Sequence, residues 1–218
     1  MKFSRPDTFI IPGRTVHLEA ILREPNDTPL RGAAVLCHPH PVYGGTMDNR
    51  VVFRAGKAIM EASFAALRFN FRGVGSSTGT FDQGIGEKDD VVSVIDWLEQ
   101  RYPAIPLALV GFSFGAWVGL EVAASEKRIR ALAGLGLPLN FYDFEFLVEN
   151  DKPSLFIVGT QDEFCPRDRI ERLARRLPPT SRVALIEGAD HFFARELDRV
   201  QQLITQFFQE LRLDGVGP

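Results

Sequence analysis

The feature that most constrains the fold of this chain is a regular alternation of short apolar runs with longer amphipathic stretches. The apolar runs fit β-strands and cover residues 16–22, 33–37, 64–71, 107–112, 131–135, 154–159 and 182–187. The amphipathic stretches fit helices and cover about 48–62, 86–101, 114–126, 166–177 and 193–212. Because strands that alternate with helices form βαβ units, we expect an α/β fold with a mostly parallel, twisted sheet flanked by helices. The length of 218 residues favours one domain over 1–218.

Composition and charge exclude several classes of protein. Hydrophobic residues make up 45% and charged residues 24% of the chain, as in an ordinary globular protein rather than a disordered or fibrous one. With 25 Lys and Arg against 28 Asp and Glu, the net charge is −3, so we expect no nucleic-acid partner. No window approaches the roughly 18 apolar residues of a membrane span, and the start shows no secretory signal, so we expect a cytoplasmic protein without a membrane partner. The oligomeric state is not indicated.

The cysteines and histidines do not form a metal-site pattern. Cys37 and Cys165 are too few for a disulfide framework and lack the spacing of a metal site, so we expect buried thiols. His38 and His40 lie near Cys37, but no further ligand cluster completes a site. We therefore expect neither a metal nor another cofactor.

A G-x-S-x-G pentapeptide at 111–115 stands between the apolar run 107–110 and the helical stretch that follows it. In this strand-turn-helix context the pattern is typical of a nucleophile elbow, in which a tight turn lifts the serine Oγ above the sheet. The following helix N-terminus offers N–H groups to a developing oxyanion. We therefore predict Ser113 as a nucleophile.

A serine hydroxyl needs an adjacent base, and the chain has four histidines. His191 fits best, because it lies in a loop between a late strand and the last helix, where it can reach the elbow. His17 lies inside an early predicted strand, so we interpret it as a solvent-facing or hydrogen-bonded structural residue.

The acid that orients the base should follow another strand and precede the histidine in the chain. Asp162 satisfies both conditions, since it follows the apolar run 155–159. Glu163 and Asp168 remain alternatives, and Asp162 as a helix-capping acid is a further one. Asp190 is adjacent to the base and is interpreted as a local turn residue.

An oxyanion hole needs a second N–H besides that of Phe114, usually from the loop after the third strand. In that loop Pro39 and Pro41 have no N–H, so His40 is the donor that we predict between them. His38 is interpreted as a buried loop anchor that forms hydrogen bonds.

The segment 72–79 contains several glycines after a predicted strand and is superficially similar to a dinucleotide-binding fingerprint. After Gly73 and Gly75 the third glycine should fall at Thr78, and no helix begins until about Gly86. We interpret the segment as a flexible glycine turn beside the active-site face.

Serine, aspartate and histidine in this order on an α/β pattern resemble the α/β-hydrolase superfamily over nearly the whole chain. The strings H-P-H-P-x-x-G-G-T-M-x-N at 38–49 and F-N-F-R-G-V-G-x-S-x-G at 69–79 resemble small bacterial hydrolases described as dienelactone-hydrolase-like. Dienelactone hydrolases proper use cysteine where this chain has Ser113, so their substrate is not carried over. The resemblance implies the α/β-hydrolase fold.

Family members often insert a cap domain between the sixth and seventh strands, where this chain has only about 136–153. That length allows one short helix in 141–147, so we expect a minimal cap or none and an open cleft. Side chains that we expect to bind substrate are Tyr43, Phe144, Phe164 and Phe192, with Phe146 as a further wall. Since the chain has 18 phenylalanines, a core position stays open for each Phe.

Together these features predict a serine hydrolase that cleaves carboxylic esters of small to medium acyl groups through a Ser-His-Asp triad and an acyl-enzyme. Without a lid, hydrolysis is favoured over acyl transfer. A thioester, lactone or amide substrate stays open, because the same tetrahedral intermediate serves all of them. A non-catalytic ligand-binding hydrolase fold is a further alternative.

Overall fold

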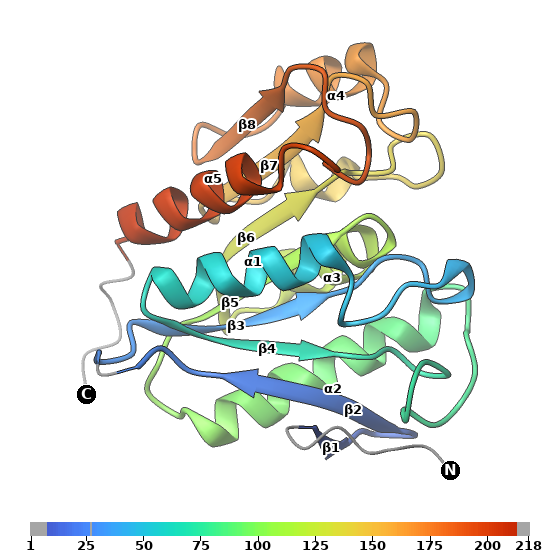
Figure 1. The fold of residues 1–218 in the computed structure, drawn as a ribbon, viewed down its shortest axis with the longest axis vertical. Coiled ribbons are helices and arrows are strands. Elements are labelled where there is room, and N and C mark those ends of the chain that lie inside the picture. The colour runs from blue at the N-terminus through green and yellow to red at the C-terminus, as the bar shows by residue number, and fades with distance from the viewer. Residues whose placement is uncertain (1–7, 27, 213–218) are drawn as a thin grey trace.

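A computed structural model describes residues 8–26 and 28–212 of the chain, and an eight-stranded sheet forms its centre (Figure 1). The strands lie in the order β1-β2-β4-β3-β5-β6-β7-β8. Strands β1 and β2 pair antiparallel, as do β2 and β4, and all later pairs are parallel. The bounds of the strands are β1 Phe9–Pro12, β2 His17–Arg23, β3 Gly32–Cys37, β4 Phe64–Phe69, β5 Leu107–Phe112, β6 Ile129–Leu135, β7 Ser154–Gly159 and β8 Ser181–Ile186. The predicted α/β fold with a mostly parallel sheet is confirmed.

Helices cover both faces of the sheet (Figure 1). Their bounds are α1 Arg50–Glu61, α2 Ile85–Arg101, α3 Phe114–Ser125, α4 Arg167–Ala174 and α5 Leu197–Glu210, with short 3-10 helices η1 Pro41–Tyr43 and η2 Glu145–Leu147. Helices α1 and α5 pack on one face, whereas α2, α3 and α4 contribute to the apolar cluster on the other. Within β3, Ala34 and Leu36 point to the first face, and Val35 and Cys37 to the second. This alternation buries both faces of the strand, as its continuous apolar sequence predicts.

The first strand was not predicted from the sequence. β1 has four residues and ends at Pro12, and its Ile11 is buried against the core. A run of this length is too short to show a hydrophobic periodicity that distinguishes a strand from a loop. Among the described strands, β1 pairs only with β2 and is therefore an edge strand.

The strand order fixes where a site can form. From β3 the chain first moves to β4 on one side and later returns to β5 on the other side. At such a switch point the loops after neighbouring parallel strands diverge and leave a crevice outside their carboxyl ends. The loops after β3 and β5 therefore border the same crevice.

Little chain covers this end of the sheet. Between β6 and β7 the only helical element is η2, which has three residues. The expectation of a minimal cap thus holds, although the short helix is a single 3-10 turn. None of the described helices is long and apolar enough to cross a membrane.

Candidate active site

Ser113 lies in a sharp turn between β5 and α3. Its backbone has φ 55° and ψ −122°, a conformation that residues with a side chain rarely adopt. The turn is tight: a Cβ at Gly111 would lie 2.4 Å from the Gly115 carbonyl oxygen, and one at Gly115 would lie 2.4 Å from the His38 carbonyl oxygen. Glycine at both positions is therefore required by close backbone approach, and the turn places Ser113 directly after the carboxyl end of β5.

Three side chains form a continuous hydrogen-bonded chain from this serine. His191 Nε2 lies 2.9 Å from Ser113 Oγ, and His191 Nδ1 lies 2.8 Å from Asp162 Oδ2. Asp162 and His191 are each 4% exposed. A carboxylate next to Nδ1 holds the proton there and leaves Nε2 free to accept one from the serine. The arrangement can therefore activate a hydroxyl nucleophile.

Asp162 is itself held by its own loop. Its Oδ1 accepts hydrogen bonds from the backbone N–H of Phe164 at 2.8 Å and of Cys165 at 3.2 Å. These bonds stabilise the ionised carboxylate and fix its second oxygen toward the imidazole.

The alternatives to these residues lie elsewhere. Glu163 is exposed, and Asp168 is exposed and pairs with Arg172 at 3.0 Å on the surface of α4. Asp190 accepts from the backbone N–H of Phe192 at 3.0 Å, which confirms its interpretation as a turn residue. His17 is exposed on β2.

His40 and Phe114, whose backbone amides are the predicted oxyanion donors, line the same cavity as Ser113. Phe114 is the first residue of α3, and His40 lies in the loop after β3. Within the described part of the chain, neither the Phe114 N–H nor the His40 N–H donates a hydrogen bond. Burial lowers the pKa of the His40 side chain, whose Nδ1 accepts from Val42 N–H at 3.2 Å. Two unused donors at this point fit the binding of an oxyanion.

Above these residues lies an open cavity of about 540 Å³. It is lined by Pro39, His40, Tyr43, Gly44, Gly45, Asn49, Ser113, Phe114, Pro138, Phe141, Tyr142, Phe164, His191 and Phe192. The lining contains no Asp, Glu, Lys or Arg among the described residues. Tyr43, Phe141 and Phe192 at the cavity are 85%, 63% and 52% exposed, which leaves an apolar, unlidded opening.

Phe144 is a correction to the expected walls. Tyr43, Phe164 and Phe192 line the cavity as expected, but Phe144 is 2% exposed, packs in the core on the α3 side of the sheet and does not line it. Its ring packs against Phe146, which is also outside the lining. The chain enters the core just before η2, so Phe144 is a core residue, which is the alternative that the sequence left open for each Phe.

The aromatic wall instead comes from residues that the sequence argument missed. Phe141 and Tyr142 line the cavity and belong to the same aromatic segment as Phe144, which follows them directly after Asp143. Tyr142 stacks on Trp117 of α3, with ring centroids 4.0 Å apart and an interplanar angle of 6°. A run of alternating aromatic residues gives no signal of which members face a cleft, so only the path of the loop separates them.

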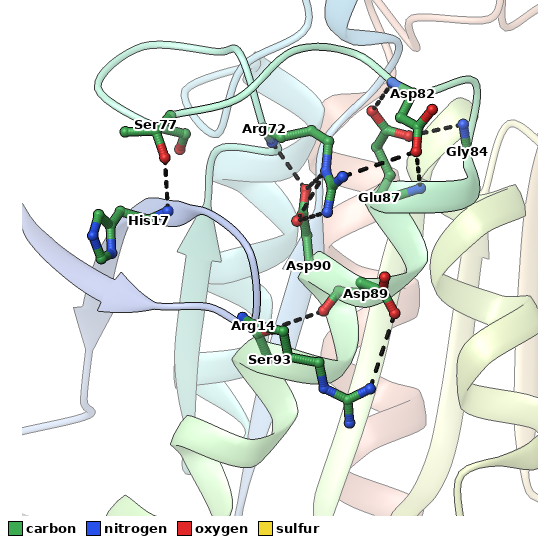
Figure 2. A network of polar contacts seen from close by, with 12 residues as sticks. Arg14, His17, Arg72, Ser77, Asp82, Gly84, Glu87, Asp89, Asp90 and Ser93 are labelled. Atoms are coloured by element: carbon green, nitrogen blue, oxygen red, sulfur yellow. Dashed lines mark hydrogen bonds and ion pairs between the residues drawn. The ribbon is translucent and has the colours of Figure 1, made fainter.

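Hydrogen bonds connect the glycine-containing turn 73–79 to neighbouring segments. Gly73 N–H donates to the Thr78 carbonyl at 3.1 Å, and Thr78 N–H donates to the His17 carbonyl at 2.9 Å. The turn begins at Arg72, whose Nη2 lies 2.7 Å from Asp90 Oδ1 and whose N–H donates to Asp90 Oδ2 at 3.0 Å (Figure 2). Burial raises the pKa of Asp90, and the hydrogen bonds from Arg72 oppose that shift. The pair thus anchors the turn to α2.

The end of the same loop contacts the loop after β3 that contains His40. Glu87 is fully buried and accepts hydrogen bonds from the backbone N–H groups of Asp82 at 2.9 Å and Gly84 at 2.8 Å (Figure 2). Phe81 directly precedes this anchored stretch, and the centroid of its ring lies 4.9 Å from that of His40. The network therefore supports one side of the loop that carries the His40 amide.

Neither cysteine thiol lines the cavity. Both thiols are free and buried, as expected, and burial raises the pKa of Cys37 and Cys165. No group of three or more His, Cys, Asp or Glu side chains in the described ranges could hold a metal ion.

A family model for an alpha/beta hydrolase domain matches residues 33–210. The chain belongs to the alpha/beta hydrolase family. This alpha/beta hydrolase is also similar to solved structures. A serine hydrolase homologue from Coxiella burnetii has a TM-score of 0.87 at 33% identity and covers 94% of this chain and 98% of that chain. A serine hydrolase without lid, XC6422 from Xanthomonas campestris, has a TM-score of 0.84 at 30% identity and covers 94% of each chain.

A third match is local. The mitochondrial palmitoyl-protein thioesterase ABHD10 of Homo sapiens is 33% identical over 98 residues, which are 44% of this hydrolase and 31% of that protein. The comparisons therefore confirm the resemblance to the family and to its lidless serine hydrolases.

Proposed function

We propose that this hydrolase cleaves carboxylic esters of small to medium acyl groups, with Ser113 as nucleophile, His191 as base and Asp162 as the acid that orients it. The observation that carries the proposal is the unbroken chain of hydrogen bonds from Asp162 through His191 to Ser113, with donor–acceptor distances of 2.8 and 2.9 Å. The proposed substrate is a small neutral ester, and neither a metal nor another cofactor is part of the proposal. The cytoplasmic location expected from the sequence belongs to the proposal as well.

In the first half of the reaction, Ser113 Oγ attacks the ester carbonyl while its proton passes to His191 Nε2. The negative charge on the carbonyl oxygen is held by the N–H groups of His40 and Phe114, each worth on the order of 3 kcal/mol. When the intermediate collapses, the C–O bond to the alcohol breaks and His191 gives its proton to the leaving oxygen. Asp162 stays ionised and stabilises the imidazolium in between.

In the second half, His191 takes a proton from a water molecule that attacks the acyl-enzyme. The second tetrahedral intermediate releases the carboxylic acid and returns the proton from His191 to Ser113 Oγ. The open cavity supports this step, because water reaches the acyl group without a lid to displace.

The test compares wild type with Ser113→Ala. We expect a fluorophosphonate probe to label only the wild type, and hydrolysis of p-nitrophenyl acetate and butyrate to fall by at least about 10⁴-fold in kcat in the variant. Circular dichroism of both proteins controls for folding. A folded Ser113→Ala protein that keeps most of its kcat would contradict the assignment, and a folded wild type without labelling would favour the ligand-binding alternative.

A thioester substrate is a second candidate, supported by the local match to a protein named as a palmitoyl-protein thioesterase. The same triad and intermediate serve both bonds. Butyryl thioester hydrolysis, followed by thiol release, is to be compared with hydrolysis of the matched butyrate oxygen ester. A kcat/KM for the thioester more than about 100-fold above that for the oxygen ester would assign the thioesterase activity instead.

A further inference from the structure

His38 lies directly after β3, is fully buried and forms two hydrogen bonds with the backbone. Phe71 N–H donates to its Nε2 at 3.0 Å, and its Nδ1 lies 2.6 Å from the Pro39 carbonyl oxygen. Since a backbone N–H requires an acceptor, Nε2 carries no proton, and the proton of the neutral ring is on Nδ1. The ring therefore donates to Pro39 and accepts from Phe71. This confirms the interpretation of His38 as a buried anchor of the loop.

The Pro39 carbonyl belongs to the same peptide unit as the His40 N–H. In a trans peptide the C=O and N–H vectors point in opposite directions, and the described chain contains no cis peptide. A bond that holds the Pro39 carbonyl toward the buried His38 ring therefore directs the His40 N–H away from that ring.

The next peptide is held as well. Gly45 N–H donates to the His40 carbonyl at 3.0 Å, and a Cβ at Gly45 would lie 2.0 Å from the Pro39 oxygen. The loop thus closes tightly around the peptide between Pro39 and His40, and only glycine at 45 allows this approach.

We propose that His38 is a positioning residue that aims the His40 amide at the oxyanion formed during ester cleavage. The inference rests on the proposed function, since it assumes attack by Ser113. A donor on the Pro39 carbonyl also polarises the peptide and makes the His40 N–H a stronger donor. Burial lowers the pKa of His38 to about 4, which keeps the ring neutral and Nε2 an acceptor at neutral pH.

Two substitutions separate the two bonds of the ring. In His38→Asn the side-chain amide nitrogen reaches the position of Nδ1, so the donor to Pro39 is kept and the contact with Phe71 is lost. In His38→Gln the longer side chain reaches the position of Nε2 and accepts from Phe71, while the donor to Pro39 is lost. We expect His38→Gln to lower kcat for p-nitrophenyl butyrate by about 10- to 100-fold with KM nearly unchanged, and His38→Asn to keep kcat within a few-fold of wild type.

Inhibition by a trifluoromethyl ketone, which forms an oxyanion in the site, provides a second measurement. If His38 were only structural, its substitution would not change this inhibition in parallel with kcat. The inhibition constant of the ketone should rise in His38→Gln by the same factor as kcat falls, and stay near the wild-type value in His38→Asn. The exposed His17→Gln is the matched control and should change neither quantity. Equal losses in the Asn and Gln variants, or a loss confined to KM, would overturn the proposal.

A measurement on the wild type keeps the inference testable if the variants do not fold. Imidazole ¹⁵N chemical shifts at pH 7 should show Nδ1 of His38 protonated and Nε2 unprotonated, and the opposite tautomer or an imidazolium would overturn the proposal. Failure of the proposed function is a separate result, since it would show as turnover that persists in Ser113→Ala.

Discussion

Ser113, the proposed nucleophile, has a strained backbone conformation. Its φ of 55° lies in the left-handed region, and the flanking Gly111 and Gly115 leave no room for the turn to relax. Such a conformation costs about 1–3 kcal/mol in a residue with a side chain. The fold tolerates this cost because β5 and α3, both well packed, hold the two ends of the turn.

Replacing Ser113 by Gly should therefore relieve strain that Ser113→Ala retains. We expect the free energy of unfolding of Ser113→Gly to exceed that of Ser113→Ala by about 1 kcal/mol in urea denaturation, with both variants inactive. Ser93 in the interior of α2 provides the control, since there Gly should be less stable than Ala by about 0.5–1 kcal/mol. The same order at both positions would show that the backbone at 113 stores no strain.

At the scale of elements, the connection between β6 and β7 divides its aromatic residues between the core and the cleft. Phe144 is buried on the α3 side of the sheet, whereas Phe141 and Tyr142 line the cavity. Phe192, which also lines the cavity, comes from the loop that follows β8 and carries His191. The path of the connection between β6 and β7 therefore decides which of its aromatic residues lie in the core and which line the cavity.

Phe144 and Phe192 should consequently respond in opposite ways to truncation. Phe144→Ala should lower the free energy of unfolding by about 3–5 kcal/mol and leave KM for p-nitrophenyl butyrate unchanged at a temperature where the variant is folded. Phe192→Ala should change stability by no more than about 0.5 kcal/mol and raise KM. Denaturant unfolding and steady-state kinetics measure both effects. A raised KM in folded Phe144→Ala would place this ring back in the cleft.

At the scale of the whole molecule, the chain has a net charge of −3, but the described residues that line the cavity include no Asp, Glu, Lys or Arg. Arg128 pairs with Glu99 at the surface, and Arg72 pairs with Asp90 at the 72–84 loop. The carboxylate of Asp162 is buried and forms a hydrogen bond with His191. An anionic acyl group would therefore lose its hydration without gaining a cation.

This hydrolase should accordingly discriminate against anionic acyl groups. We expect kcat/KM for p-nitrophenyl hemisuccinate to fall at least about 10-fold below that for the neutral p-nitrophenyl butyrate. Tyr43 is exposed at the cavity, and Tyr43→Arg would place a cation there. This variant should reduce the difference in kcat/KM between the butyrate and hemisuccinate esters. Equal rates for the two esters in the wild type would show that the apolar lining does not select by charge.

The sequence by itself determined the order and type of the main elements, and it indicated the candidate triad and the candidate oxyanion donors. Period and length distinguish buried strands from amphipathic helices, and the elbow glycines, the order Ser113, Asp162, His191 and the prolines beside His40 are all local signals. The first strand and the exact ends of helices carry no such signal.

Only the tertiary structure decided which side chains meet. Asp162 and His191 approach within 2.8 Å although 29 positions separate them, because the loops after β7 and β8 end on the same edge of the sheet. The division of Phe141 and Phe144 between cleft and core, and the bond from His38 to the Pro39 carbonyl, depend likewise on how loops fold over that edge. Contacts between segments that are distant in the chain leave no periodic pattern in the sequence. They are therefore decided by tertiary packing and not by local sequence.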